Sequence, residues 1–165
     1  MLARVLVAAT VLWPLMAGSA VWHRATQESG GGTPAVGALY LVASRICHQR
    51  PERSFATHDV KWPVCARCTG LYLAAPFAGV VALGRRRRTP GGERLQALRL
   101  VAIAAIPTVL TLLWEWGGLG TPPNLWRFVT ALPLGAAITV VLIREAREAV
   151  PQNPSGTLTG DGSAS

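Results

Sequence analysis

Apolar stretches separated by short polar segments run along most of this chain. The long stretches cover residues 5–22, 64–84, 100–114 and 125–143. A helix needs about 20 mostly apolar residues to cross a bilayer, so the pattern predicts about four transmembrane helices. We therefore predict an all-α fold, a polytopic membrane helix bundle.

The first apolar stretch has two interpretations. A single basic residue, Arg4, precedes a run that reaches the small residues 17–20, as in a signal peptide. The run continues to Trp22, however, and a tryptophan suits the end of a membrane span. We predict that residues 1–22 form a first membrane span or signal-anchor that is not cleaved.

Residues 23–63 are expected to form a loop that contains one short helix. Apolar residues recur at helical spacing within residues 35–46, which predicts a helix lying at the membrane surface. This helix would present Cys47 and His48 at its end, and Pro51 would stop any helix there. The apolar positions on its predicted face are Leu39, Val42, Ala43 and Ile46.

A three-span membrane core is expected over residues 64–149. Pro63 is predicted to be the first residue of the second membrane helix, because a helix start does not need the missing N–H of proline. Cys65 and Cys68 would then lie in the first two helical turns, on the same face as Tyr72.

The charge distribution favours a membrane over nucleic acid as the partner. The chain has 165 residues and a net charge of +8, yet it is 50% hydrophobic and only 15% charged. Apolar runs separate the basic residues, and no aromatic residue interleaves with the arginines at 85–88. These arginines predict a cytoplasmic loop, which places both termini in the cytoplasm and the cysteine loop on the extracytoplasmic side of a multi-pass protein. The tail, residues 150–165, is rich in Gly, Ser and Thr and is predicted to be disordered.

The cysteines and two histidines predict a metal site. All three cysteines of the chain lie within residues 45–72. The Cys-x-x-Cys spacing lets two sulfurs reach one ion, and sulfur with nitrogen favours zinc among the divalent ions. The two histidines are alternatives for the fourth position. The candidate ligands are Cys47, His48, His58, Cys65 and Cys68.

Two charged residues at the ends of membrane spans give the site a possible catalytic role. If four protein groups bind the metal, the metal is structural; if three do, water fills the open position. Glu115 could then act as a base and Arg127 could stabilise an anion. The alternative is that these two residues pair with each other at the span ends. Asn124 would cap the fourth helix or supply hydrogen bonds to the site.

Redox chemistry is the main alternative to metal binding. Cys65 and Cys68 could form a disulfide that exchanges with Cys47, as in a membrane thiol-disulfide oxidoreductase, with a quinone near Tyr72. Such enzymes normally use a second cysteine pair, and only Cys47 remains for that role. A purely structural disulfide or buried thiols are a third interpretation.

The cysteine motifs resemble a known family. Residues 47–55 and 63–72, and more weakly Asn124, Arg127, Thr130 and Gly135, are similar to the bacterial and archaeal predicted membrane proteins called domain of unknown function 2085. The resemblance covers roughly residues 38–143. It implies a membrane protein and supports the choice of site residues, while the family name implies no activity, so whether the protein is an enzyme stays open.

Overall fold

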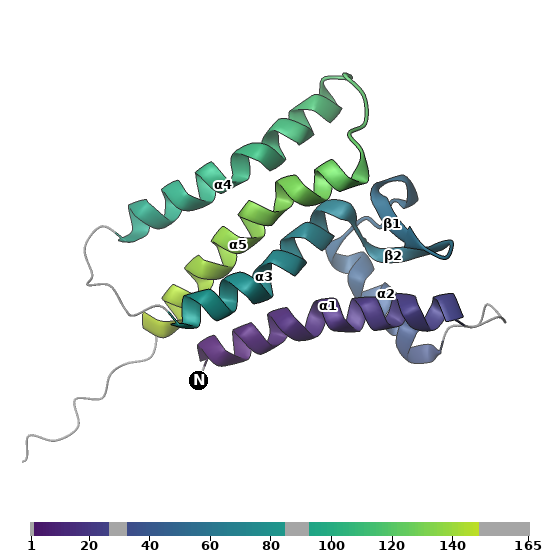
Figure 1. The fold of residues 1–165 in the computed structure, drawn as a ribbon, viewed down its shortest axis with the longest axis horizontal. Helices are drawn as coiled ribbons and strands as arrows, with labels where there is room; N and C mark the ends of the chain where they lie inside the picture. The colour runs from purple at the N-terminus through teal and green to yellow at the C-terminus, as the bar shows by residue number, and fades with distance from the viewer. Residues whose placement is uncertain (1, 27–32, 85–92, 149–165) are drawn as a thin grey trace, which may run out of the picture.

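Four long helices, one short helix and a small β-hairpin make up the described part of the chain. The computed structural model describes residues 2–26, 33–84 and 93–148. The helices and strands, in chain order, are α1 (Leu2–Thr26), α2 (Pro34–Ile46), the 3-10 turn η1 (Pro51–Arg53), β1 (Ser54–Thr57), β2 (Val60–Cys65), α3 (Ala66–Gly84), α4 (Glu93–Trp116) and α5 (Asn124–Glu148). In Figure 1, α3 and α5 lie between α1 and α4, and the hairpin and α2 lie at one end of the bundle, which we call the hairpin end.

The predicted membrane helix bundle is confirmed. Helices α1, α3, α4 and α5 are all long and apolar enough to cross a membrane. Their large apolar side chains face outward in many places, Leu98 and Ile103 of α4 among them, as expected where lipid replaces water. The predictions for the arginines at 85–88 and for the tail 150–165 lie outside the described residues.

Helices α3 and α5 approach each other closely because two glycines lie between them. A Cβ atom at Gly70 would collide with the carbonyl oxygen of Phe128, and one at Gly135 would collide with the backbone of Leu71. Small residues at helix contacts are how membrane helices bring their backbones together. This seam sets the start of α5 against the start of α3, at the hairpin end.

Helix α1 packs into the same bundle. Its small and β-branched side chains meet α3 and α5 far from the hairpin end, in a buried cluster made of Ala3, Val7, Ala82, Ile143 and Ala146. Near its other end, α1 contacts α2 through Ala20, Val36 and Leu39. Helix α1 is therefore packed against other helices near both of its ends.

The structure corrects the predicted start of the second membrane helix. That helix, α3, begins at Ala66, and Pro63 lies inside strand β2. Proline is tolerated there because both strands of a two-stranded sheet are edge strands, which leave some N–H groups unpaired. Cys65 therefore ends a strand, and only Cys68 lies in the first helical turn.

The hairpin was missed because its turn lacks the usual sequence signal. Thr57 pairs with Val60 across the two residues 58–59, whose φ angles are 46° and 63°. Two positive φ angles are typical of a type I′ hairpin turn, which asparagine and glycine signal most strongly. At the other end of the hairpin, Ser54 pairs with Cys65.

The short helix predicted before the cysteine loop is present as α2. Of the four apolar positions on its predicted face, Leu39 and Ala43 are buried within the protein, whereas Val42 and Ile46 are exposed. Helix α2 ends at Ile46 as predicted, so Pro51 does not act as its stop. Pro51 instead begins η1, as a proline readily does at the first position of a helix.

Candidate metal site and its arginine neighbours

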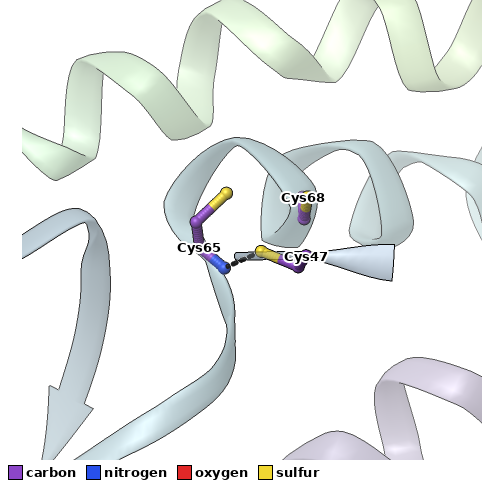
Figure 2. A group of neighbouring side chains, drawn as sticks. All are labelled: Cys47, Cys65 and Cys68. Atoms are coloured by element: carbon purple, nitrogen blue, oxygen red, sulfur yellow. Dashed lines mark hydrogen bonds between the residues drawn. The ribbon is translucent and has the colours of Figure 1, made fainter. Parts of the chain in front are cut away.

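Three cysteines from separate segments come together at the hairpin end. Cys47 follows α2, Cys65 ends β2 and Cys68 lies in the first turn of α3 (Figure 2). Their Sγ atoms all lie within 4.8 Å of one another. In a tetrahedral site with Zn–S bonds of about 2.3 Å, sulfurs lie about 3.8 Å apart. Shifts of about 1 Å would let this thiol cluster, Cys47, Cys65 and Cys68, hold one ion.

Backbone hydrogen bonds fix the thiol cluster. The N–H of Cys65 donates to the Cys47 Sγ atom at 3.2 Å (Figure 2). The side-chain amide of Gln49 donates to the carbonyl oxygens of Tyr40 and Pro63, each at 2.8 Å. Since one amide group spans both, the segment that carries Cys47 is tied to α2 and to β2.

Apolar and aromatic side chains surround the sulfurs. Ala43, Cys47 and Val64 form a buried cluster, and Trp13, Cys65, Cys68 and Tyr72 pack against it. The rings of Trp13 and Tyr72 meet edge to face with centroids 6.0 Å apart. Cys65 and Cys68 stay half-buried, so a small ion or molecule can reach them.

Hydrogen bonds from its neighbours make the Cys65 thiol acidic. A hydrogen bond from the Cys68 side chain is the main cause, and the Cys47 side chain and the backbone N–H groups of Cys68 and Arg67 add to it. Together they outweigh burial and lower the pKa of Cys65 to about 5. Thiolate is the form of cysteine that binds metals and attacks disulfides.

The two candidate histidines are not part of the thiol cluster. Both His48 and His58 are exposed, and neither joins the group of converging ligand atoms. His58 lies in the hairpin turn, and β2 between that turn and Cys65 spans about 17 Å. His48 directly follows Cys47, so it is the nearer of the two along the chain.

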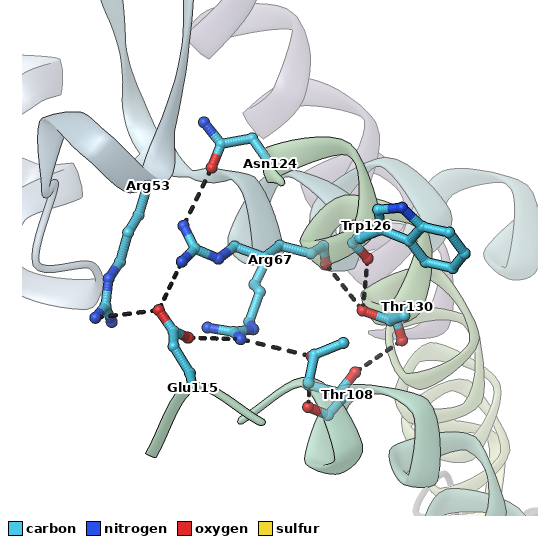
Figure 3. A network of polar contacts seen from close by, with 9 residues as sticks. Arg53, Arg67, Thr108, Glu115, Asn124, Trp126 and Thr130 are labelled. Atoms are coloured by element: carbon cyan, nitrogen blue, oxygen red, sulfur yellow. Dashed lines mark hydrogen bonds and ion pairs between the residues drawn. The ribbon is translucent and has the colours of Figure 1, made fainter. Parts of the chain in front are cut away.

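On the other side of α3, three arginines surround one carboxylate. Glu115, near the end of α4, contacts Arg127 at 2.6 Å, Arg67 at 2.9 Å and Arg53 at 3.1 Å (Figure 3). We call Arg53, Arg67 and Arg127 the arginine cluster. The side chains of Glu115 and Arg127 are only 4% and 3% exposed, so this pair is buried. The predicted pairing of these two residues is present, within a larger group.

Asn124 links the arginine cluster to the hairpin. Its Oδ1 atom accepts a hydrogen bond from Arg127 at 3.2 Å, and its Nδ2 atom donates to the carbonyl oxygen of Ser54 at 3.1 Å. Ser54 is the residue that pairs with Cys65. Of its two predicted roles, Asn124 thus supplies hydrogen bonds, and these connect the start of α5 to the thiol cluster.

Sequence reasoning missed two arginines and one tryptophan of this region. Arg67 lies between Cys65 and Cys68, so its helical position already points it away from the sulfurs. Arg53 reaches Glu115 only because η1 and the hairpin fold back, and no sequence pattern signals that. Trp13 comes from α1, more than thirty residues before Cys47, and only the packing of α1 brings it to the site.

These features define a multi-pass helical membrane protein with a cysteine site at one end of its bundle. The chain belongs to the family described as predicted membrane protein (DUF2085), whose sequence model matches residues 47–141. The matched region contains every residue of the thiol and arginine clusters.

Two archaeal relatives are similar to this chain. An uncharacterised protein of Methanothermobacter thermautotrophicus is 36% identical over 96 residues, which cover 58% of this chain and 83% of the relative. An uncharacterised protein of Methanocaldococcus jannaschii is 31% identical over 110 residues, which cover 64% and 66% of the two chains. No solved structure matches the chain.

Proposed function

We propose that this membrane protein binds a divalent metal ion, zinc first, through Cys47, Cys65 and Cys68. The convergence of three Sγ atoms within 4.8 Å carries the proposal. Thiolate ligands favour zinc over magnesium or calcium. The N–H of Cys65 that points at the Cys47 sulfur stabilises negative charge on that ligand.

The fourth ligand position is proposed to be open to a small molecule from solution. Three protein ligands with a fourth position for water or substrate are typical of catalytic zinc, whereas four protein ligands are typical of structural zinc. His48 is the alternative fourth ligand because it adjoins Cys47. His58 is disfavoured by its place in the distant hairpin turn.

Glu115 is better suited to hold the arginines than to act as a base. Its two carboxylate oxygens form ion pairs with Arg53, Arg67 and Arg127. A carboxylate engaged in this way has little capacity left to accept a proton. We therefore assign Glu115 a positioning role and leave Arg127 as the residue that would interact with an anion.

The orientation in the membrane is proposed from the arginines at 85–88. The ends of α3 and α4 that flank this segment lie opposite the hairpin end (Figure 1). An arginine-rich loop favours the cytoplasm. The hairpin end, with the thiol cluster, would then face the extracytoplasmic side, and both termini would lie in the cytoplasm.

Elemental analysis of the detergent-purified protein tests the metal proposal. About one ion per chain is expected in the wild type, and a loss of most of it in Cys47→Ser, Cys65→Ser and Cys68→Ser. His48→Ala, with His58→Ala as its matched control, then reports whether the fourth position is open. Full metal content in both histidine variants supports the open site, whereas loss in His48→Ala alone means that histidine closes it.

A membrane thiol-disulfide oxidoreductase is the second candidate. A small apolar hollow beside the thiol cluster is lined by Trp13, Pro14, Ala17, Trp62, Val64, Thr69, Tyr72 and Leu73. Such a surface suits the edge of a quinone ring, with Tyr72 as a contact. Oxidation of Cys65 and Cys68 to a disulfide would release two electrons and two protons, which reduce a quinone to a quinol. Absence of metal, together with one free thiol in the unreduced wild type, would discard the metal site in favour of a disulfide.

A further inference from the structure

The arginine cluster carries more positive charge than its protein partner can balance. Three guanidinium groups against one carboxylate leave a formal charge of +2. Among the described residues, Glu115 is the one carboxylate that forms an ion pair with these arginines. Charge removed from water is costly unless it is paired, so this region lacks negative charge.

The hydrogen bonds of the cluster point independently to a missing acceptor. The Nε atoms of Arg53, Arg67 and Arg127 are all buried and have no hydrogen-bond partner among the described residues. Arg127 as a whole is only 2% exposed. Buried N–H groups are nearly always paired in folded proteins, and each guanidinium has five such donors.

The cluster also has an open side. Exposure of the side chain rises from 3% at Arg127 to 13% at Arg67 and 33% at Arg53. Arg53 belongs to η1, at the hairpin end of the bundle (Figures 1 and 3). A small anion can therefore approach along Arg53, while Arg127 forms the buried base of the site.

We propose that the arginine cluster binds a phosphate group. Planar guanidinium groups pair with phosphate oxygens through two parallel hydrogen bonds. A phosphate monoester carries about −1.5 to −2 charges at neutral pH, which matches the excess of the cluster, and the phosphodiester of an anionic lipid offsets part of that excess. The group can come from free or solute phosphate or from a lipid headgroup at the membrane surface. This site goes beyond the proposed metal site and does not require a bound metal.

The test measures thermal unfolding of the full chain in neutral detergent. One arm compares sodium phosphate with sodium chloride at equal ionic strength. The second arm compares mixed micelles containing phosphatidylglycerol with micelles containing phosphatidylcholine. The variant is Arg53→Gln, at the exposed rim, and its matched control is Arg45→Gln, an exposed arginine of α2 outside the cluster. Metal content is measured on the same samples, so that a failed metal site is recognised separately.

We expect phosphate or phosphatidylglycerol to raise the unfolding temperature of the wild type and of Arg45→Gln. In Arg53→Gln the half-saturating concentration should rise about tenfold, as for the loss of one charged hydrogen-bonding partner. Stabilisation by sodium phosphate would identify a soluble phosphate as the ligand. Stabilisation by phosphatidylglycerol alone would identify a lipid headgroup as the ligand. No stabilisation of the wild type, or equal stabilisation of Arg53→Gln, would overturn the proposal. If Arg53→Gln does not fold, Arg53→Lys replaces it, with weakened binding expected because lysine lacks the planar fork.

Discussion

The thiol cluster and the arginine cluster lie on two sides of the first turn of α3, and different interactions hold them in place. On the thiol side, main-chain groups fix the side chains: the Cys65 N–H holds Cys47, and Gln49 holds two carbonyl oxygens. On the arginine side, charged side chains from η1, α3, α4 and α5 hold one another through Glu115. Changes of charge should therefore damage the arginine side far more than the thiol side.

Loss of the carboxylate should have the largest effect. Glu115→Gln leaves three arginines without a counter-charge, and breaking a buried ion pair costs about 3–5 kcal/mol of stability. We expect a strongly lowered unfolding temperature in detergent, with metal still bound in the protein that remains folded. Glu145→Gln, at an exposed position of α5, is the control for the loss of one negative charge. If the two variants unfolded alike, Glu115 would not be what holds the arginine side.

A substitution at the contact between α3 and α5 should have a smaller effect on stability and should affect the arginine side alone. A methyl group at Gly70 must displace the carbonyl of Phe128, and overpacking of this kind costs about 1–3 kcal/mol. Because α5 carries Arg127 and Asn124, we expect Gly70→Ala to weaken phosphate binding while the metal content is preserved. Gly18→Ala in α1, where a methyl group meets no atom within 4 Å, should not lower the unfolding temperature, because alanine favours a helix over glycine, and should leave phosphate binding unchanged. Equal loss of metal and phosphate in Gly70→Ala would show that the two sides are not independent.

Most of the thiol side could be predicted from the sequence. The lengths of the apolar runs predicted the membrane helices, and the Cys-x-x-Cys spacing, with Cys47 before it, selected the residues that the structure brings together. Both signals are local: a run of apolar residues or a spacing within one turn requires no knowledge of distant contacts.

The arginine side could be predicted only in part, because it depends on contacts between distant segments. Glu115 and Arg127 were singled out as residues at neighbouring span ends, but Arg53 reaches them through a hairpin whose turn has no glycine or asparagine. Because residues 60–65 form a strand of that hairpin, α3 begins later than predicted. Because His58 lies in the hairpin turn, it does not join the three cysteines. The local spacing of residues predicts neither the later start of α3 nor the position of His58.

The smallest structural change is expected from protonation on the thiol side. In protein stripped of metal with a chelator, Cys65 should react as a thiolate down to about pH 5, because the Cys68 side chain lowers its pKa from 9.0 to about 5. Its rate of alkylation by iodoacetamide, followed at the peptide level by mass spectrometry, should reach half its maximum near that pH. Since the folded-state pKa lies below that of an unfolded thiol, the thiolate contributes fully to stability above about pH 9. That contribution is lost as the pH falls through about 5.

Cys68→Ala provides the comparison that decides the cause of this acidity. An alanine cannot donate to the Cys65 sulfur, so the midpoint of the alkylation curve should move upward toward that of an ordinary thiol. Glu145→Gln, at an exposed position near the opposite end of α5, should leave the midpoint in place. A midpoint that stayed near pH 5 in Cys68→Ala would mean that the backbone N–H groups at the start of α3 stabilise the thiolate without help from the neighbouring thiol.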